Sequence, residues 1–288
     1  MRIVVLGVTG MLGNAVFRTL TADPEHEVWG TLRDEAGKSF FRESTRQRLK
    51  SGIDVLNRHR LTTLLEKMRP EVVINCTGLV KQLSTANDPL LVLPINAMLP
   101  HELARMCGDS GARLVQLSSD CVFSGRKGSY EESDFPDADD LYGKSKAMGE
   151  LLNHPHAITL RTSGIGHELM TKHGLLEWFL CQQGEVRGFA RAIYSGLPSV
   201  ELARVIKDFV LPHPEITGLY HVSAKPITKL DLLELIAKRY GKKISIKPDE
   251  IFAADRSLVS RRFTLATGYV AAEWPELIAV MHRCRHGN

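Results

Sequence analysis

The amino-acid sequence predicts an α/β fold in which a parallel, doubly wound sheet carries helices on both of its faces. Short apolar segments rich in valine, isoleucine and leucine alternate with amphipathic helical patterns over the first 160 residues. Strands of this composition are typical of a sheet buried on both faces, and the alternation is typical of parallel crossover connections. A glycine-rich segment directly after the first strand adds a third observation, because such a turn opens the first helix of doubly wound folds.

The strands and helices follow in order along the chain. In the first half, strands are expected at Ile3–Leu6, Glu27–Leu32, Val72–Asn75, Arg113–Leu117 and Ala157–Leu160, and helices at Leu12–Leu20, Arg60–Met68, Leu93–Cys107 and Tyr142–Leu152. The pattern then loosens, with helices expected at Leu175–Cys181, Val200–Val210 and Leu230–Arg239 and strands at Gly218–Val222 and Lys243–Ile246. We therefore divide the chain into a sheet domain, residues 1–163, and a smaller C-terminal lobe, residues 164–288, and expect the two to interleave.

Composition excludes several classes of protein. The 288 residues are 43% hydrophobic and 24% charged, which is enough for one sizeable core with a smaller lobe. Apolar runs are too short for a membrane span or a secretory signal, and five scattered cysteines indicate reduced thiols in a cytoplasmic protein. No cysteine or histidine spacing indicates a metal site. The net charge of +4, with its densest basic stretch at residues 42–50, is better explained by a solvated surface than by nucleic-acid binding.

The glycine-rich segment spans Gly7-Val8-Thr9-Gly10-Met11-Leu12-Gly13 and joins the first strand to the first helix. Glycines at this spacing allow a tight turn, a close approach of the backbone to a pyrophosphate, and close helix–strand packing. The following helix N-terminus offers free N–H groups and a positive dipole end to phosphates. An ordinary strand–helix turn is the alternative, but the position after the first strand favours a dinucleotide site.

Further cofactor contacts are expected where other strands end. Arg33 follows the second strand, at the place where an NAD site usually carries an acidic residue, so it favours a 2′-phosphate and NADP(H). Asp34 comes next and keeps NAD(H) as the alternative. Asn75-Cys76-Thr77-Gly78 ends another strand with small residues against which a cofactor can lie, and Asp54-Val55 could contact the adenine edge. A plain turn and a helix start are the alternatives for these two segments.

Tyr142 and Lys146 form the catalytic pair that the sequence suggests. They are four residues apart at the start of a predicted helix and therefore share one face of it. A nearby lysine cation favours the phenolate and is expected to lower the pKa of a tyrosine from about 10. Ser118 and Ser119 end the preceding strand and could bind a carbonyl oxygen. Because neighbouring strand residues point to opposite faces, the two serines stay alternatives on this ground.

Taken together, these motifs resemble those of the extended short-chain dehydrogenases/reductases, which have a Rossmann fold, and within them the dTDP-4-dehydrorhamnose reductase family. The resemblance covers nearly the whole chain. It rests on the glycine turn and on seven further segments, namely residues 118–125 (SSDCVFSG), Tyr130-Glu131-Glu132 with Pro136, 142–150 (YGKSKAMGE), 160–163 (LRTS), 196–203 (GLPSVELA), 218–223 (GLYHVS) and 260–264 (SRRFT).

The resemblance implies a role for each matching position. Ser119 stands at the place of the catalytic hydroxyl residue, with Tyr142 as proton donor and Lys146 as its partner. Ser119 and Asp120 would contact the sugar, and Arg261 would reach the pyrophosphate of the substrate. The residues implied to line the NADP(H) site are Met11, Leu12, Gly13, Asp54, Val55, Gly78, Leu79 and Val80, in addition to Gly7, Thr9, Gly10, Arg33, Cys76, Tyr142 and Lys146.

The resemblance further implies a reductase of a nucleotide-activated 4-keto-6-deoxy sugar, active in deoxysugar and polysaccharide biosynthesis. Residues 1–163 would then be the NADP-binding domain and residues 164–288 the substrate-binding lobe. The protein could also form a homodimer. Cys121 follows Asp120 where dehydratases carry a glutamate, which argues against 4,6-dehydration, and Gly164 stands where these reductases usually carry tryptophan. A sugar-nucleotide epimerase and a non-catalytic, NADP-binding regulatory subunit are the alternative functions.

Overall fold

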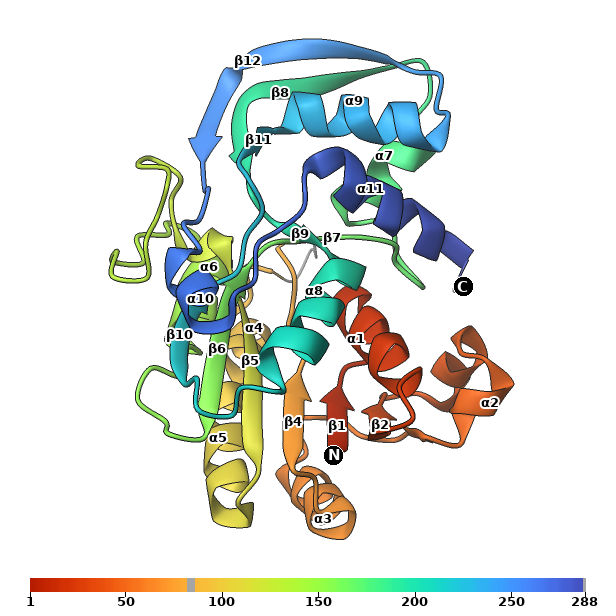
Figure 1. Cartoon of the computed structure of the whole chain (residues 1–288), viewed down its shortest axis with the longest axis vertical. Coiled ribbons are helices and arrows are strands. Elements are labelled where there is room, and N and C mark those ends of the chain that lie inside the picture. The colour runs from red at the N-terminus through yellow and green to blue at the C-terminus, as the bar shows by residue number, and fades with distance from the viewer. Residues whose placement is uncertain (82–85, 287–288) are drawn as a thin grey trace.

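The computed structural model describes residues 1–81 and 86–286 of the chain. Figure 1 shows a central sheet flanked by helices and, above one end of this sheet, a smaller lobe built largely from the C-terminal part of the chain. The N-terminus lies at the lower end of the sheet. No helix within the described residues is long and apolar enough to cross a membrane.

Seven parallel strands form the central sheet. In spatial order they are β3 (Leu49–Lys50), β2 (Glu27–Thr31), β1 (Arg2–Leu6), β4 (Val72–Asn75), β5 (Arg113–Ser119), β6 (Ala157–Thr162) and β10 (Gly218–His221). The direction of progression reverses between β1 and β4, which creates a crevice beyond the carboxyl ends of these strands. The predicted doubly wound sheet is thereby confirmed, with all five predicted N-terminal strands in it.

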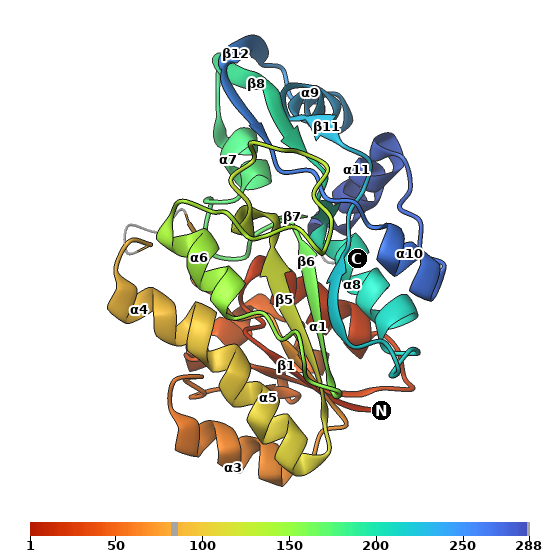
Figure 2. The same cartoon turned by 90° about the vertical axis from the view of Figure 1, so that its left-hand side faces the viewer.

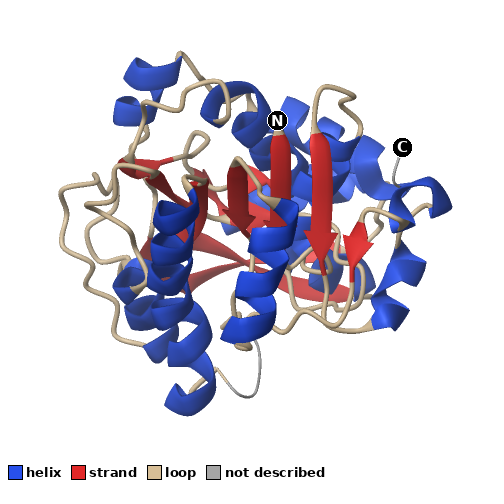
Figure 3. Cartoon of the chain, turned by 90° about the horizontal axis from the view of Figure 1, so that it is seen from below, coloured by secondary structure: helices blue, strands red, loops and turns tan. Residues whose placement is uncertain are grey.

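Helices cover both faces of this sheet, because the strands carry apolar side chains on each face. Ile3 and Val5 of β1 belong to one buried cluster, whereas Val4 and Leu6 belong to another. The first cluster is covered by α1 (Met11–Thr21), α8 (Ser199–Val205) and the π-helix η4 (Ile206–Val210). The second is covered by α3 (Arg58–Met68) and α5 (Leu99–Ser110). Figures 2 and 3 show these two helical layers on opposite sides of the strands.

Shorter elements connect these layers. The 3₁₀-helix η1 (Glu35–Phe40) and α2 (Glu43–Arg46) follow β2, and η3 (Asp120–Val122) follows β5. The predicted helix Leu93–Cys107 is a longer bent unit of α4 (Pro89–Leu93), the π-helix η2 (Pro94–Met98) and α5. The helix α6 (Leu141–Met148) ends four residues before its predicted end at Leu152. Gly149 is the C-cap of this helix, and it passes so close to the carbonyl oxygen of Asn96 that a Cβ there would overlap with it.

The smaller lobe is built on a three-stranded sheet, in the order β11 (Ile227–Thr228), β8 (Glu185–Tyr194) and β12 (Ser245–Asp255). The sequence does not predict β8, because the small residues Gly188 and Ala192 occupy inward positions and weaken the two-residue alternation. The strand predicted at Lys243–Ile246 is instead the long β12. The other elements of this part are β7 (Gly164–Ile165), β9 (Leu197–Pro198), α7 (Leu175–Cys181), α9 (Lys229–Tyr240), α10 (Arg261–Thr267), α11 (Trp274–Arg283) and η5 (Cys284–His286).

Several elements that follow residue 163 pack on the sheet domain. β10 pairs with β6 in the central sheet, and α8 lies against α1. The chain therefore crosses between the two lobes more than once, and the carboxyl ends of β4 and β5 face the smaller lobe. The division of the chain at residues 163 and 164 stays a prediction.

Candidate active site

The glycine-rich turn between β1 and α1 fits a pyrophosphate. Gly7 adopts a left-handed backbone conformation (φ +79°), and the N–H of Gly10 donates a hydrogen bond to its carbonyl oxygen over 3.1 Å. A Cβ on Gly13 would overlap with the Gly7 carbonyl group, so the helix can approach the turn this closely only with glycine there. Gly10 caps α1 without a side-chain hydrogen bond, which leaves the first N–H groups of the helix open to an anion.

The end of β2 is tied to this turn and places Arg33 beside it. The N–H of Gly7 donates to Oγ1 of Thr31 (3.3 Å), and the N–H of Val8 donates to the Thr31 carbonyl (3.1 Å). Arg33 follows two residues later and is exposed. The 3₁₀-helix η1 then folds back over the turn, because a Cβ on Gly37 would come within 3.2 Å of Thr9. This geometry supports the sequence-based role of Arg33, which stays a prediction.

The Arg33 guanidinium is expected to discriminate between the two nicotinamide dinucleotides. In Arg33→Ala the dissociation constant of NADPH should rise roughly tenfold, since a hydrogen bond to a charged group contributes about 1.5–3 kcal/mol. The dissociation constant of NADH should change little, because NADH lacks the 2′-phosphate. Fluorescence titration of both cofactors measures the ratio. Equal weakening of NADPH and NADH would contradict a specific contact with the phosphate.

Asn96 was not singled out from the sequence, yet it holds the loop after β4. Its Oδ1 accepts a hydrogen bond from the N–H of Leu79 (2.9 Å), and its Nδ2 donates to the Leu79 carbonyl (3.1 Å) and to Oγ of Ser145 (3.2 Å). The loop carrying Cys76, Gly78, Leu79 and Val80 is thereby fastened to α6. Asn96 lies in the π-helix η2, a distortion that often marks functional sites. The sequence signal that could have indicated Asn96 is an asparagine within an apolar helical segment.

The other expected cofactor residues differ in how tightly they are held. Asp54 is exposed, and one of its carboxylate oxygens already accepts a hydrogen bond from the N–H of Leu56 (3.0 Å). Val55 packs at the edge of the core, while Met11 and Leu12 lie within van der Waals distance of a Cβ built on Gly164. Burial raises the pKa of the Cys76 thiol to about 12, so it acts as a small apolar neighbour.

The helix α6 is set so that Tyr142 faces the end of β5. Asp140 caps the helix by accepting a hydrogen bond from the N–H of Gly143 (2.8 Å). A Cβ on Gly143 would overlap with the carbonyl oxygen of Cys121, so glycine is needed for the first turn of α6 to press against η3. This close packing brings the side chain of Tyr142 within hydrogen-bonding reach of Ser119.

The structure distinguishes the two adjacent serines. Ser118 points to one face of the sheet, where its hydroxyl donates to Oε1 of Glu150 (2.7 Å). Ser119 points to the other, where its hydroxyl donates to Oδ1 of Asp120 (3.2 Å) and accepts from the N–H of Cys121 (3.1 Å). Only Ser119 shares a space with Tyr142, which agrees with the role that the family resemblance implies for it.

The charges of the pair differ from the sequence-based expectation. Burial raises the pKa of Tyr142 above its usual range, and hydrogen bonding from Ser119 offsets only part of this. Burial also lowers the pKa of Lys146 to about 8, against the opposing effect of Glu150. Lys146 donates a hydrogen bond to the Leu117 carbonyl over 2.7 Å. Tyr142 is therefore protonated at neutral pH, as a proton donor must be.

Two cations from the smaller lobe face the same site. β11 and β12 flank β8 on opposite sides at Ile193, which pairs with Thr228 and with Asp255. Lys229, the first residue of α9, and Arg256 directly follow these two strands. The charges of both act on the buried Asp120, and Arg256 also donates a hydrogen bond to the Phe123 carbonyl (2.8 Å). The smaller lobe thus lays a positive surface over the end of β5.

Lys229 has no ion-pair partner within residues 1–81 and 86–286. Burial lowers its pKa, and the charge of Asp120 only partly opposes this. Lys81 reaches the same region and forms an ion pair with Asp140. A half-buried ammonium that forms no direct ion pair with the described residues favours an anionic ligand. The sequence missed Lys229 because nothing in a helix start shows which surface will lie opposite.

Arg261, the residue expected at the substrate pyrophosphate, is exposed at the start of α10, which packs on β10. Its neighbour Arg262 lies with its guanidinium 4.6 Å from the centre of the Tyr220 ring. It is Arg256, five positions earlier, whose charge acts on Asp120. The role of Arg261 stays a prediction, and Arg256 is an additional candidate for the same task.

Comparisons with known proteins show what this chain is similar to. The family model of the RmlD substrate binding domain matches residues 1–261. The probable low-salt glycan biosynthesis reductase Agl14 of Haloferax volcanii is 32% identical over 163 residues, which cover 55% of this chain and 52% of that protein. The beta subunit of methionine adenosyltransferase 2 from Xenopus laevis is 29% identical over 163 residues, covering 56% and 46%. The chain thus spans about half the length of these two curated relatives.

A solved structure has the same fold. The dTDP-4-dehydrorhamnose reductase of Bacillus anthracis, crystallised in complex with NADP, superposes with a TM-score of 0.78 at 22% identity, and 98% of each chain is covered. At this identity the likeness concerns the fold alone. The match of the family model over most of the sequence confirms the predicted family: the chain belongs to the proteins that carry the RmlD substrate binding domain.

Proposed function

We propose that the protein is an NADPH-dependent reductase of a nucleotide-activated 4-keto-6-deoxy sugar. The observation that carries this proposal is the convergence of Ser119, protonated Tyr142 and Lys146 at the carboxyl end of β5, beside a glycine turn fit for a pyrophosphate. The NADP complex of the B. anthracis reductase supports the choice of cofactor. NADH is the alternative electron donor.

The residues divide the reaction between them. The bound nicotinamide cofactor supplies a hydride to the C4 carbonyl carbon. Ser119 binds the carbonyl oxygen by a hydrogen bond, and Tyr142 donates its hydroxyl proton to that oxygen as the carbonyl becomes an alcohol. The Lys146 cation then stabilises the phenolate left on Tyr142. Solvent returns the proton to Tyr142 before the next turnover.

The positive surface formed by Lys229 and Arg256 supports a substrate with an anionic group. A diphosphate between nucleoside and sugar supplies such a group at a fixed distance from the reacting carbonyl. Cys121 beside Asp120 leaves the site without the second acidic residue that dehydration needs. Together these features favour simple reduction of a nucleotide-linked sugar.

Lys229→Met is expected to raise KM for the sugar nucleotide roughly tenfold or more with little change in kcat. The reason is that a charge-assisted hydrogen bond to a phosphate remote from the reacting carbon stabilises ground and transition states alike. Lys225→Met is the matched control, because Lys225 is exposed and pairs with Glu273. Steady-state kinetics of both variants decide. An unchanged KM in Lys229→Met would remove Lys229 from the substrate site.

A non-catalytic, NADP-binding regulatory subunit is the second candidate. The similarity to methionine adenosyltransferase 2 subunit beta favours it. Such a protein would bind NADPH without consuming it in the presence of keto sugars. A sugar-nucleotide epimerase, the third candidate, would interconvert substrate stereoisomers with no net change in NADPH.

The deciding experiment follows NADPH absorbance at 340 nm with dTDP- and UDP-linked 4-keto-6-deoxy sugars. Stoichiometric NADPH loss, with a new alcohol found by mass spectrometry, is the expected result. Measurable NADPH binding with no oxidation by any of these substrates would favour the regulatory candidate. Isomerisation without NADPH loss would favour the epimerase.

A further inference from the structure

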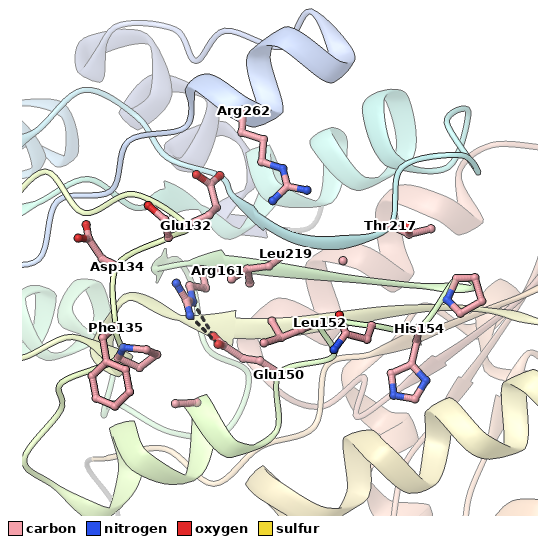
Figure 4. Close-up of a pocket in the computed structure, with 16 residues that line it drawn as sticks. Glu132, Asp134, Phe135, Glu150, Leu152, His154, Arg161, Thr217, Leu219 and Arg262 are labelled. Carbon is pink, nitrogen blue, oxygen red and sulfur yellow. Dashed lines mark hydrogen bonds and ion pairs between the residues drawn. The ribbon is translucent and has the colours of Figure 1, made fainter.

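A buried ion pair lies one helical turn beyond Lys146 and has no part in the reaction described above. Glu150 and Arg161 are each about 3% exposed. Oε1 of Glu150 accepts from Nε of Arg161 and Oε2 accepts from its Nη2, both over 2.7 Å. Figure 4 shows the two side chains pointing toward one another on the floor of a pocket of about 840 Å³ beside β10. Burying two charges is costly, so this pair calls for an explanation.

The remaining polar groups of the pair are also satisfied. Nη1 of Arg161 lies 3.2 Å from Nε2 of His221, and Nδ1 of His221 lies 3.1 Å from the Tyr130 carbonyl. Burial and the Arg161 charge lower the pKa of His221 to about 3, so the ring is neutral. Nδ1 must then carry the proton and donate to Tyr130, which leaves Nε2 to accept from Arg161. The guanidinium is thereby fixed in one orientation.

This ion pair is joined to the strand that carries the catalytic hydroxyl. Glu150 accepts from Ser118, and Lys146 donates to the carbonyl of the adjacent Leu117, each over 2.7 Å. Lys146 in the last turn of α6 and Glu150, two residues after the helix ends, therefore bind two consecutive residues of β5 directly before Ser119. A shift of α6 along β5 would break both bonds and separate Tyr142 from Ser119.

We propose that Glu150 is a positioning residue of the active site, which, held by Arg161 and Ser118, fixes the chain directly after α6 on β5 and supplies an anion for Lys146. This inference rests on the proposed function for its catalytic consequence only. The charged groups that act on Lys146 are Glu150, four residues on, and the Cys76 thiol after β4. The thiol is neutral because burial raises its pKa to about 12. Glu150 is therefore the anion that offsets the desolvation of Lys146.

The first test measures the charge of Lys146 directly, without substrate or cofactor. The rate of Lys146 acetylation by acetic anhydride is followed against pH by peptide mass spectrometry in the full-length protein. The midpoint is expected near pH 8 in the wild type. In Glu150→Gln it should fall by about one pH unit or more, because a neighbouring carboxylate favours the charged form. Ser118→Ala, which removes a hydrogen bond but keeps the carboxylate, should leave the midpoint unchanged.

The second test is the pH profile of kcat. Its alkaline limb should follow the loss of the Lys146 charge and move to lower pH in Glu150→Gln but not in Ser118→Ala. Glu150→Asp retains the charge one methylene further away and should show a smaller shift in the same direction, which keeps the test informative if the Gln variant does not fold. Equal acetylation midpoints in the wild type, Glu150→Gln and Glu150→Asp would overturn the proposal. An inactive wild type would instead reject the proposed function, since the acetylation midpoint does not depend on catalysis.

Discussion

Replacing Tyr142 with phenylalanine is expected to lower kcat for the keto sugar by roughly 10²–10⁴-fold, the contribution of a positioned general acid. The variant loses only the hydroxyl that donates the proton, while the ring still packs against η3. Its Kd for NADPH should change by less than about threefold, because the pyrophosphate is bound by the glycine turn some distance along the crevice. Stopped-flow absorbance of NADPH in single turnovers isolates the chemical step.

Tyr194 provides the control for this substitution. Tyr194 is also buried near Asp120, but its hydroxyl donates to the Ser163 carbonyl (3.3 Å) rather than pointing at the reacting space. Tyr194→Phe should therefore keep kcat within about tenfold of the wild type, with a modest loss of stability from one hydrogen bond. Retention of full activity by Tyr142→Phe would rule out Tyr142 as the proton donor.

The second large effect is expected for Gly13→Ala. The new methyl group would overlap with the Gly7 carbonyl and approach Cα of Val8 to 3.1 Å. These are backbone atoms, so α1 or the turn must shift as a whole. Overpacking of this kind costs about 1–3 kcal/mol, which should lower Tm by roughly 5 °C. NADPH affinity should fall at least about tenfold, because the helix N-terminus no longer meets the phosphates.

Gly10→Ala is the control that tests whether the loss of stability is specific to Gly13. A Cβ at Gly10 meets only the Gly7 carbonyl oxygen at 3.5 Å, an ordinary contact, and Gly10 has no positive φ. Its Tm without cofactor should therefore match the wild type within about 2 °C, since surface changes usually stay within ±0.5 kcal/mol. Differential scanning fluorimetry with and without NADPH measures both quantities. Gly13→Ala with wild-type Tm and cofactor affinity would contradict the close packing of α1 on the turn.

Most of the sheet domain could be predicted from the sequence. Apolar runs such as Ile3–Leu6 and Val72–Asn75 are strands in the structure. A strand that is buried on both faces is apolar at every position, so it can be recognised from its own sequence without knowing what packs against it. The glycine spacing located the first crossover for a similar reason, since Gly13 is required by the backbone of its own turn. The strand β8 escaped notice because its inward positions carry glycine and alanine, whose burial depends on what packs above them.

The residues of the candidate site also fall into those that the sequence could indicate and those that only the structure showed. Local spacing was sufficient to nominate Tyr142 and Lys146, because four residues within one helix fix their relation. The choice of Ser119 over Ser118 needed the orientation of β5 relative to α6, and the raised pKa of Tyr142 needed its burial. Asn96, Glu150, Lys229 and Arg256 act across gaps of 11 to more than 100 residues, where only the packing of separate elements decides which groups meet. The sequence by itself determined the doubly wound fold and the candidate catalytic residues. The tertiary structure decided which side chains share the crevice and with what charge, because desolvation and partner charges exist only once the two lobes are packed together.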